Sequence, residues 1–135
     1  MLFRSNEPFA SIRLIVNDVD ESLAFYIGLL GFVLQVRAGN AFASVTKGPM
    51  RLLLSSLTSS GATPMPDGCK QEPGGWTRIL LTVHDLEAEV KRLQAANIKF
   101  RNDILKGVGG SQILMLDPSG NVIELFEPAE HSHDH

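Results

Sequence analysis

Hydrophobic and polar residues alternate along two segments that resemble each other and lie about half a chain apart. Residues 12–18 read IRLIVND and residues 79–85 read ILLTVHD, an offset of 85 − 18 = 67 positions. Alternation with a period of two is typical of β-strands that have one buried face. The recurrence therefore predicts two modules of the same design, each opening with a strand.

A helical pattern follows each of these strands. Its apolar positions, spaced by three and four residues, are Leu23, Tyr26, Ile27 and Leu30 in the first module and Leu86, Val90 and Leu93 in the second. We expect Asp18 or Asp20 to cap the first helix, because a carboxylate accepts hydrogen bonds from the free amides there. Gly31 and Asn97 are expected to end the two helices in the left-handed conformation.

Three short β-type runs follow each helix, at residues 32–37, 41–46 and 51–55, and again at 98–100, 112–116 and 122–126. Between the halves, residues 58–75 are rich in Ser, Gly and Pro, which predicts a connector long enough to cover a binding site. The fold class is therefore α+β, with a first βαβββ module at 9–57, a second at 76–128 and a disordered tail at 129–135. Each open sheet would expose an apolar face, so we expect the modules to combine into a single domain.

The composition is that of a globular protein, and it excludes several classes of partner. Of the 135 residues, 44% are hydrophobic and 20% are charged, and the net charge is −3. A slightly acidic chain lacks the basic face that nucleic acids and anionic membranes require. The single cysteine, Cys69, cannot form an internal disulfide, which favours a reducing compartment such as the cytoplasm. We expect no membrane span, because no apolar run has the necessary length.

The residues around the first helix and the last turn resemble those of a known superfamily. Residues 16–26 (VNDVDESLAFY), 29–32 (LLGF) and 117–125 (DPSGNVIEL) are similar to the first module and the closing hairpin of vicinal oxygen chelate proteins. That group includes glyoxalase I, bleomycin resistance proteins and extradiol dioxygenases. The resemblance implies a U-shaped mixed sheet around a cavity, frequently within a homodimer. It also implies a divalent metal held by His, Glu or Gln side chains from the first and last strands of each module.

The metal-ligand positions that the resemblance implies are mostly changed in this chain. Counting from the repeat places them at Ser11, Leu53, Arg78 and Glu124, of which only Glu124 is an ordinary ligand. An arginine stays cationic and repels a metal ion, and a catalytic centre needs about three protein ligands. We therefore expect no metal and no other cofactor, with a divalent metal as the alternative.

Strand alternation assigns the mixed polar residues of the first and last strands to the cavity. The candidate ligand-binding residues are Ser11, Arg13, Leu53, Arg78 and Glu124, with Arg51 on the same face and aromatic surfaces from Phe42, Trp76 and Phe126. An arginine in such a pocket can hold a carboxylate or phosphate through two parallel hydrogen bonds. For Arg78 the alternative is an ion pair with Glu124 that fills the place of the metal.

Two functions of different class follow from these residues. The first is a metal-free protein, expected as a homodimer, that sequesters or senses a small anionic or aromatic compound. The second is a glyoxalase-like lyase or isomerase, with an atypical metal site involving His84 or acid–base chemistry on Glu124. A purely structural or interaction role is a third. The tail histidines, His131, His133 and His135, can bind metal but offer no shaped pocket, so we interpret such binding as adventitious.

Overall fold

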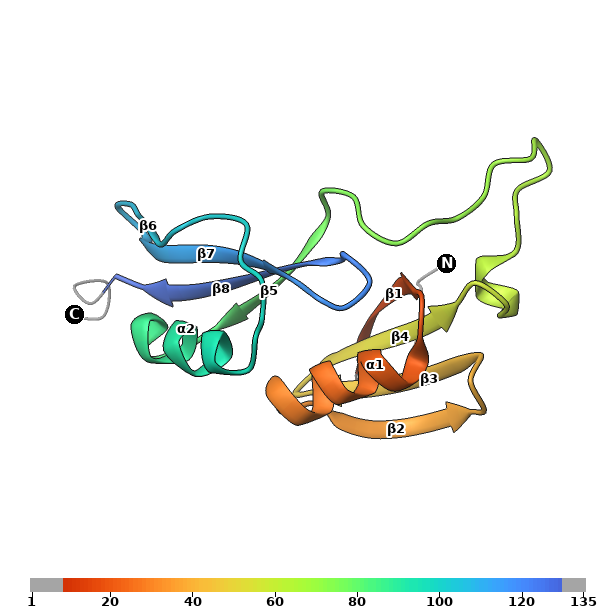
Figure 1. Cartoon of the computed structure of the whole chain (residues 1–135), viewed down its shortest axis with the longest axis horizontal. Helices are drawn as coiled ribbons and strands as arrows, with labels where there is room; N and C mark the ends of the chain where they lie inside the picture. The colour runs from red at the N-terminus through yellow and green to blue at the C-terminus, as the bar shows by residue number, and fades with distance from the viewer. Residues whose placement is uncertain (1–8, 130–135) are drawn as a thin grey trace, which may run out of the picture. The chain divides into compact units, whose positions relative to one another are not determined.

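The chain divides into two units between Pro73 and Gly74, and we call them module 1 and module 2. The structure is a computed structural model that describes residues 9–129. The predicted histidine tail lies, from residue 130 onward, outside the described residues. Both modules have the order strand, helix, three strands, which confirms the α+β class and the two βαβββ modules (Figure 1).

Module 1 contains a four-stranded mixed sheet in the order β1-β4-β3-β2. Its elements are β1 (Ala10–Val16), α1 (Val19–Leu23), the π-helical turn η1 (Ala24–Leu29), β2 (Val33–Ala38), β3 (Phe42–Lys47), β4 (Met50–Ser56) and the short 3-10 turn η2 (Ser60–Ala62). β1 runs parallel to β4, and the other neighbours are antiparallel. Parallel pairing of the first and last strands is possible because the helix provides the crossover between them.

The core of module 1 lies between the sheet and α1. Leu52 and Leu54 of β4 are fully buried, and they pair with Ile12 and Leu14 of β1 on the same face. α1 contacts β3 and β4, and its ribbon lies over the sheet in Figure 1. The uniformly aliphatic positions of the first strand therefore face the helix, as the alternation predicts.

The helix of module 1 differs from its predicted form. The α-helical turns widen into the π-helical turn η1, where the N–H of Leu30 donates to the carbonyl of Phe25 at 3.2 Å. This winding turns two adjacent rings inward, because Phe25 and Tyr26 are only 3% and 0% exposed. The predicted stripe is correct for Tyr26 and Leu30, whereas Leu23 and Ile27 are half-buried.

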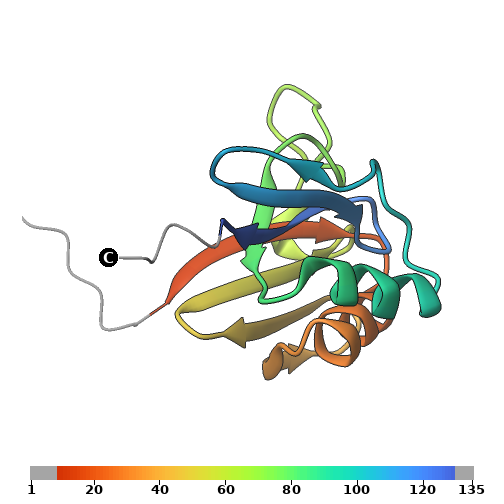
Figure 2. The same cartoon turned by 90° about the vertical axis from the view of Figure 1, so that its left-hand side faces the viewer.

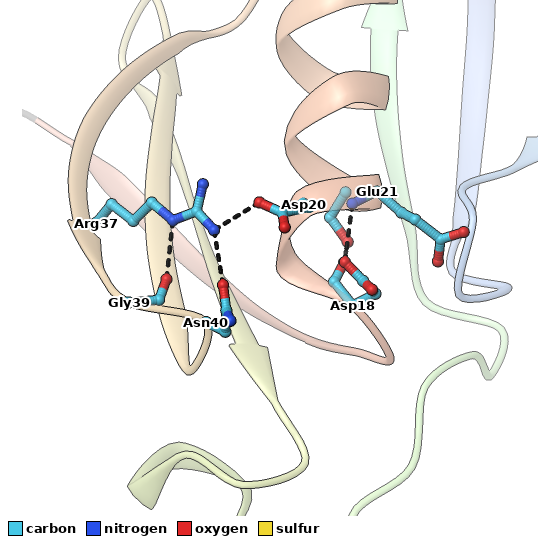
Figure 3. Close-up of polar contacts among 7 residues, drawn as sticks. Asp18, Asp20, Glu21, Arg37, Gly39 and Asn40 are labelled. Carbon is cyan, nitrogen blue, oxygen red and sulfur yellow. Dashed lines mark hydrogen bonds and ion pairs between the residues drawn. The ribbon is translucent and has the colours of Figure 1, made fainter.

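Asp18, and not Asp20, caps the helix of module 1. The Asp18 carboxylate accepts from the N–H of Glu21 at 3.0 Å, as Figure 3 shows. Asp20 instead accepts from Arg37 Nη2 at 2.6 Å, while Arg37 Nε donates to the carbonyl of Gly39 at 2.8 Å. Asp18 therefore caps the helix, whereas Asp20, through Arg37, connects the helix to the turn between β2 and β3.

Module 2 repeats the plan with a four-stranded mixed sheet in the order β5-β8-β7-β6. Its elements are β5 (Arg78–Thr82), α2 (Leu86–Ala95), β6 (Leu105–Lys106), β7 (Gly110–Leu116) and β8 (Val122–Pro128). The 90° view shows α2 as a regular helix beside these strands (Figure 2). The predicted stripe of Leu86, Val90 and Leu93 is buried, and Asn97 has the expected left-handed φ of 65°.

The prediction of a strand at residues 98–100 is wrong. That segment forms one isolated bridge, between Phe100 and Met115, and the regular edge strand is the shorter β6. The side-chain oxygen of Asn102 accepts a hydrogen bond from the N–H of Leu114 at 2.9 Å. A side chain thus takes the place of a backbone carbonyl beside β7. Within the described residues, no helix is long and apolar enough to cross a membrane.

Candidate functional site

Each sheet has a face opposite its helix, which we call the open face. In module 1 this face carries the candidate residues Ser11, Arg13, Phe42, Arg51, Leu53 and Ser55, since these positions pair with one another across β1, β4 and β3. In module 2 it carries Arg78, Leu80, Thr82, Val122, Glu124 and Phe126. The alternation confirms the predicted faces, because Ile79 and Leu81 are buried while their neighbours Arg78 and Leu80 are exposed.

Arg13 is held on the open face of module 1 by neutral groups. Its Nη1 donates to the hydroxyl of Ser55 at 2.7 Å, and Ser55 is fully buried. Gly61 of η2 lies directly over the guanidinium, so that a Cβ there would come within 2.5 Å of Nη1. Among the described residues, no carboxylate forms an ion pair with Arg13. The result is a positioned cation whose described contacts leave its charge uncompensated.

Arg51 and Ser11 occupy the neighbouring row of the same face. Arg51 Nε donates to the hydroxyl of Ser11 at 2.8 Å, and the Arg51 guanidinium lies 5.3 Å from the centre of the Phe9 ring. The candidate residue Ser11 is therefore already a hydrogen-bond acceptor for a cation. Phe42 and Leu53, half-buried, provide the apolar surface of this face.

Arg78 and Glu124 form an ion pair on the open face of module 2. Arg78 Nε lies 2.9 Å from Glu124 Oε1, and the side chains are 41% and 8% exposed respectively. Glu124 stands between Leu80 of β5 and Leu114 of β7 in the sheet register. Of the two alternatives for Arg78 that the sequence leaves open, the structure has the ion pair.

The two modules place their predicted metal-ligand positions in the same way. Ser11 pairs with Arg51, two residues before Leu53, and Arg78 pairs with Val122, two residues before Glu124. This register supports the equivalence of Leu53 and Glu124. Two of the four positions, Leu53 and Arg78, therefore provide no metal ligand. The Ser11 hydroxyl already accepts a hydrogen bond from Arg51, and the Glu124 carboxylate is already paired with Arg78.

This donor set does not fit a catalytic divalent metal. Such a centre needs about three nitrogen or oxygen ligands with lone pairs directed at one point, and leucine and arginine supply none. Within residues 9–129, no group of three or more His, Cys, Asp or Glu side chains is placed to hold a metal ion. His84 is exposed at the end of β5 and joins no such group. His131, His133 and His135 lie outside the described residues.

The sequence missed a contact between Trp76 and Arg101. The guanidinium of Arg101 lies 4.5 Å from the centre of the Trp76 ring, and Trp76 is 75% exposed. Phe126, by contrast, is half-buried within β8. No local pattern signals Arg101, because its position depends on hydrogen bonds between residues 99–102 and β7.

Among the described residues, a clear pKa shift is found in the connector, at Asp67. The N–H of Cys69 donates to Asp67 Oδ1 at 2.9 Å, which lowers the pKa of this exposed carboxyl below its ordinary value. Cys69 itself is a free, exposed thiol. Neither residue lies in a strand, so neither belongs to the paired positions that form the open faces.

Solved structures with the same fold carry different activities in their names. A lactoylglutathione lyase from Agrobacterium tumefaciens is 19% identical, with a TM-score of 0.70 over 88% of this chain and 92% of that chain. A glyoxalase/bleomycin resistance protein/dioxygenase superfamily member from Sphaerobacter thermophilus is 27% identical, with a TM-score of 0.70 over 88% and 95%. TnmS3, an antibiotic binding protein from Streptomyces sp. CB03234, is 24% identical, with a TM-score of 0.68 over 96% and 100%.

The sequence itself matches a family model over most of its length. No curated protein sequence matches the chain. The model described as the Glyoxalase/Bleomycin resistance protein/Dioxygenase superfamily matches residues 9–125, which include the open face of module 1 and all of the open-face residues of module 2 named above except Phe126. The chain therefore belongs to this superfamily, the vicinal oxygen chelate group that its helix and closing hairpin resemble.

Proposed function

We propose that this chain is a metal-free small-molecule-binding protein of the glyoxalase/bleomycin resistance type, which sequesters or senses its ligand without transforming it. The observation that carries the proposal is the 2.9 Å ion pair between Arg78 and Glu124. In the enzymes of the superfamily these two positions hold a metal, as the resemblance implies. In this chain Arg78, at one of the positions, forms an ion pair with Glu124 at the other.

The ion pair also argues against catalysis by Glu124. A general base must have a lone pair available to the proton that it removes. The Glu124 carboxylate is nearly buried, and its Oε1 accepts from a guanidinium that stays charged at any working pH. The lyase or isomerase alternative would have to use the lone pairs of Glu124 that this contact leaves, beside a permanent positive charge.

The ligand that suits module 1 carries an anionic group. Arg13 presents a fork of N–H donors, and its hydrogen bond among the described residues goes to the neutral Ser55 hydroxyl, which leaves its charge uncompensated. A carboxylate or phosphate accepts two parallel hydrogen bonds from such a fork, which gives both affinity and orientation. The likeness in fold to the antibiotic-binding protein TnmS3 supports a binding role, since it shows that this fold serves in binding elsewhere.

We also propose a homodimer located in the cytoplasm. β2 is an edge strand of module 1, and Val33, Leu34 and Val36 on it are 64%, 46% and 51% exposed. An exposed apolar edge is a site for association between chains. Sedimentation at micromolar concentration is expected to give a dimer, and a monomer throughout would contradict this assembly.

Thermal unfolding with a series of carboxylates, repeated in the presence of EDTA, tests the proposed function. A ligand that binds the folded state raises the midpoint of unfolding. We expect acetate, benzoate and naphthalene-2-carboxylate to raise it by increasing amounts, and the shifts to be unchanged by EDTA. Shifts that vanish with EDTA, or no shift with any carboxylate, would contradict the proposal.

A further inference from the structure

The pairing of β2 with β3 contains an irregularity that changes which side chains of β2 share a face. The register shifts between Leu34 and Val36, so Gln35 is an extra residue in the strand, as in a β-bulge. Gln35 and Arg37, which strict alternation would place on one face, therefore lie on opposite faces. Arg37 extends to the helix side, where it donates to Asp20 of α1 at 2.6 Å (Figure 3). Gln35 is directed away from the helix.

Gln35 lies on the open face of module 1, where a serine holds its amide group. The hydroxyl of Ser44 on β3 donates to Gln35 Oε1 at 2.8 Å, and Ser44 is only 2% exposed. Ser44 is opposite Leu53 of β4, one of the open-face residues. The two N–H bonds of Gln35 Nε2 have no acceptor among the described residues. An amide whose oxygen is engaged in this way presents a positioned donor.

Arg13 is held on the same face by the same kind of contact. Its Nη1 donates to Ser55 of β4 at 2.7 Å, so each long polar side chain of an outer strand is held by a serine of an inner strand. Ser55 pairs with Phe42, and Ser44 lies two residues further along β3. Side chains at such diagonal positions of an antiparallel sheet are about 7 Å apart. Leu53 and Phe42 occupy the other diagonal, so an apolar surface borders both polar groups.

We propose that Gln35 is a specificity-determining residue of module 1, where its amide donates to an uncharged acceptor oxygen of the ligand whose anionic group Arg13 holds. This proposal rests on the proposed function and names the class of its ligand. The ligand is a small compound with a carboxylate or phosphate at one end, an apolar middle, and a carbonyl or similar oxygen at the other. Every residue in this arrangement belongs to module 1.

The arrangement favours a ligand that reaches both polar groups at once. A carbonyl oxygen beside Gln35 replaces the water that the amide loses, whereas an apolar group removes this water without supplying an acceptor. A ligand whose two groups are closer together than the two donors reaches only one of them. Because Ser44 and Ser55 already hold the amide and the guanidinium, binding costs little side-chain entropy.

Binding of para-acetylbenzoate to the full chain tests the role of Gln35. Its acetyl oxygen lies across the ring from the carboxylate, at a separation similar to that of the two serine side chains. The comparison compound para-isopropenylbenzoate has the same shape and charge, but a methylene group replaces the acetyl oxygen. A second comparison compound, meta-acetylbenzoate, has both groups at a shorter separation. Affinities are measured by calorimetry, and the side-chain amide resonances of Gln35 in a two-dimensional NMR spectrum report on the contact.

We expect the wild type to bind para-acetylbenzoate at least about fivefold more tightly than either comparison compound, with a shift of the Gln35 amide resonances. Gln35→Met, which keeps the length of the side chain without a donor, should abolish this preference. Gln35→Glu, which has the same shape but only acceptors, should reverse it. Arg13→Met should weaken both para compounds equally, by about fivefold, because it removes the contact with the anion and not the contact with the acceptor.

Gln94→Met, the same substitution on α2 of module 2, is the matched control and should keep the preference. Equal affinity of the wild type for para-acetylbenzoate and para-isopropenylbenzoate would overturn the role of Gln35, and so would a preference that persists in Gln35→Met. Wild-type affinity in Arg13→Met would also overturn it, because the anion would then be held elsewhere. In each of these cases carboxylates still bind, so the proposed function stands. Absence of any carboxylate effect would contradict the proposed function itself, and the role of Gln35 with it.

Discussion

The two modules share one fold, yet their open faces have opposite chemistry. Arg13 and Ser55 of module 1 correspond in register to Leu80 and Phe126 of module 2, so a polar pair in one module is replaced by an apolar pair in the other. The metal-ligand positions differ as well, because module 1 has Ser11 and Leu53 where module 2 has Arg78 and Glu124. The same scaffold thus carries an uncompensated cation in one half and a self-neutralised ion pair in the other.

This difference shows how two copies of one fold can carry different side-chain chemistry. In module 2 the carboxylate has remained, and the arginine beside it compensates the charge that a metal would otherwise balance. In module 1 the described contacts do not balance the charge of Arg13, so a ligand anion can. Fold and function therefore separate at a few side chains, whereas backbone pairing is nearly the same in both modules.

The largest effect is expected at a glycine of module 2. In Gly110→Ala the new Cβ would overlap the backbone carbonyl of Glu127, and the φ of +149° is unfavourable for alanine. Neither the overlap nor the backbone strain can be relieved without moving strands of the sheet, so the free energy of unfolding should fall by about 3 kcal/mol. The measurement is urea unfolding followed by circular dichroism.

Gly61→Ala in module 1 is the matched control for this substitution. Its Cβ would meet two side chains and not the backbone: Arg13, at 2.5 Å from Nη1, and Ser55, at 2.9 Å from Oγ. The cost should stay at about 1 kcal/mol, because the guanidinium and the Ser55 hydroxyl can rotate aside at the expense of their one hydrogen bond. Equal losses in the two variants would show that backbone overlap is not the cause.

Asp117→Ala should have the next largest effect. This carboxylate is 4% exposed, and its Oδ1 accepts from the N–H groups of Ser119 and Asn121, both at 2.8 Å. Module 1 has Lys47, Gly48 and Pro49 in its corresponding turn and no such network. We expect a loss of about 2 kcal/mol in the free energy of unfolding, since buried donors would lose a charged acceptor. Asp117→Asn, which keeps one acceptor oxygen, should lose less, and equal stability of Asp117→Ala and wild type would refute the role of the turn.

A double-mutant cycle measures the ion pair of module 2. Glu124→Ala alone leaves Arg78 without its partner, and Arg78→Ala alone leaves a nearly buried carboxylate, so both should destabilise the chain. Because Arg78 is 41% exposed to solvent, the coupling should be only about 1 kcal/mol. The double variant should be more stable than the sum of the single losses indicates. A coupling of zero would mean that the pair contributes nothing to the fold.

The smallest expected effect is the difference between Arg13 and Arg78 in their contribution to ligand binding. Arg13→Met should weaken benzoate binding about fivefold, because it removes the cation that the anion would neutralise. Arg78→Met should change the affinity by less than about twofold, since Arg78 is already paired. Calorimetric titration of both variants gives the comparison, and the reverse order would assign the anion to module 2.

Local chemistry determined which parts of the fold could be predicted from the sequence. Asp18, one of the two expected caps, begins α1, and Asn97 follows α2 in the expected left-handed conformation, because capping depends on neighbouring residues alone. The strand expected at 98–100 is not formed, since Asn102 takes over a ladder hydrogen bond that only the folded sheet reveals. The π-helical winding of η1 likewise follows from the packing of adjacent rings and leaves no periodic signal.

In the candidate site, too, the sequence predicted what depends on local alternation and not what depends on contacts between distant segments. Alternation placed Arg78 and Glu124 on one face, but it could not decide between a free arginine and an ion pair, which depends on side-chain geometry. Arg101 escaped prediction because the sequence gives no sign that its segment lies against β7. Long-range pairing, and not residue type, is the missing information in both cases.

The most direct test of the metal-free account is the metal content of the chain after exposure to metal. His131, His133 and His135 are first replaced by alanine, so that tail side chains cannot contribute. The protein, purified without a metal column, is incubated with zinc, nickel, manganese and iron(II), dialysed, and measured by mass spectrometry. The account predicts that none of the ions is retained in stoichiometric amount. One tightly bound ion per chain would contradict it, because it would require a set of ligands that the described residues do not bring together.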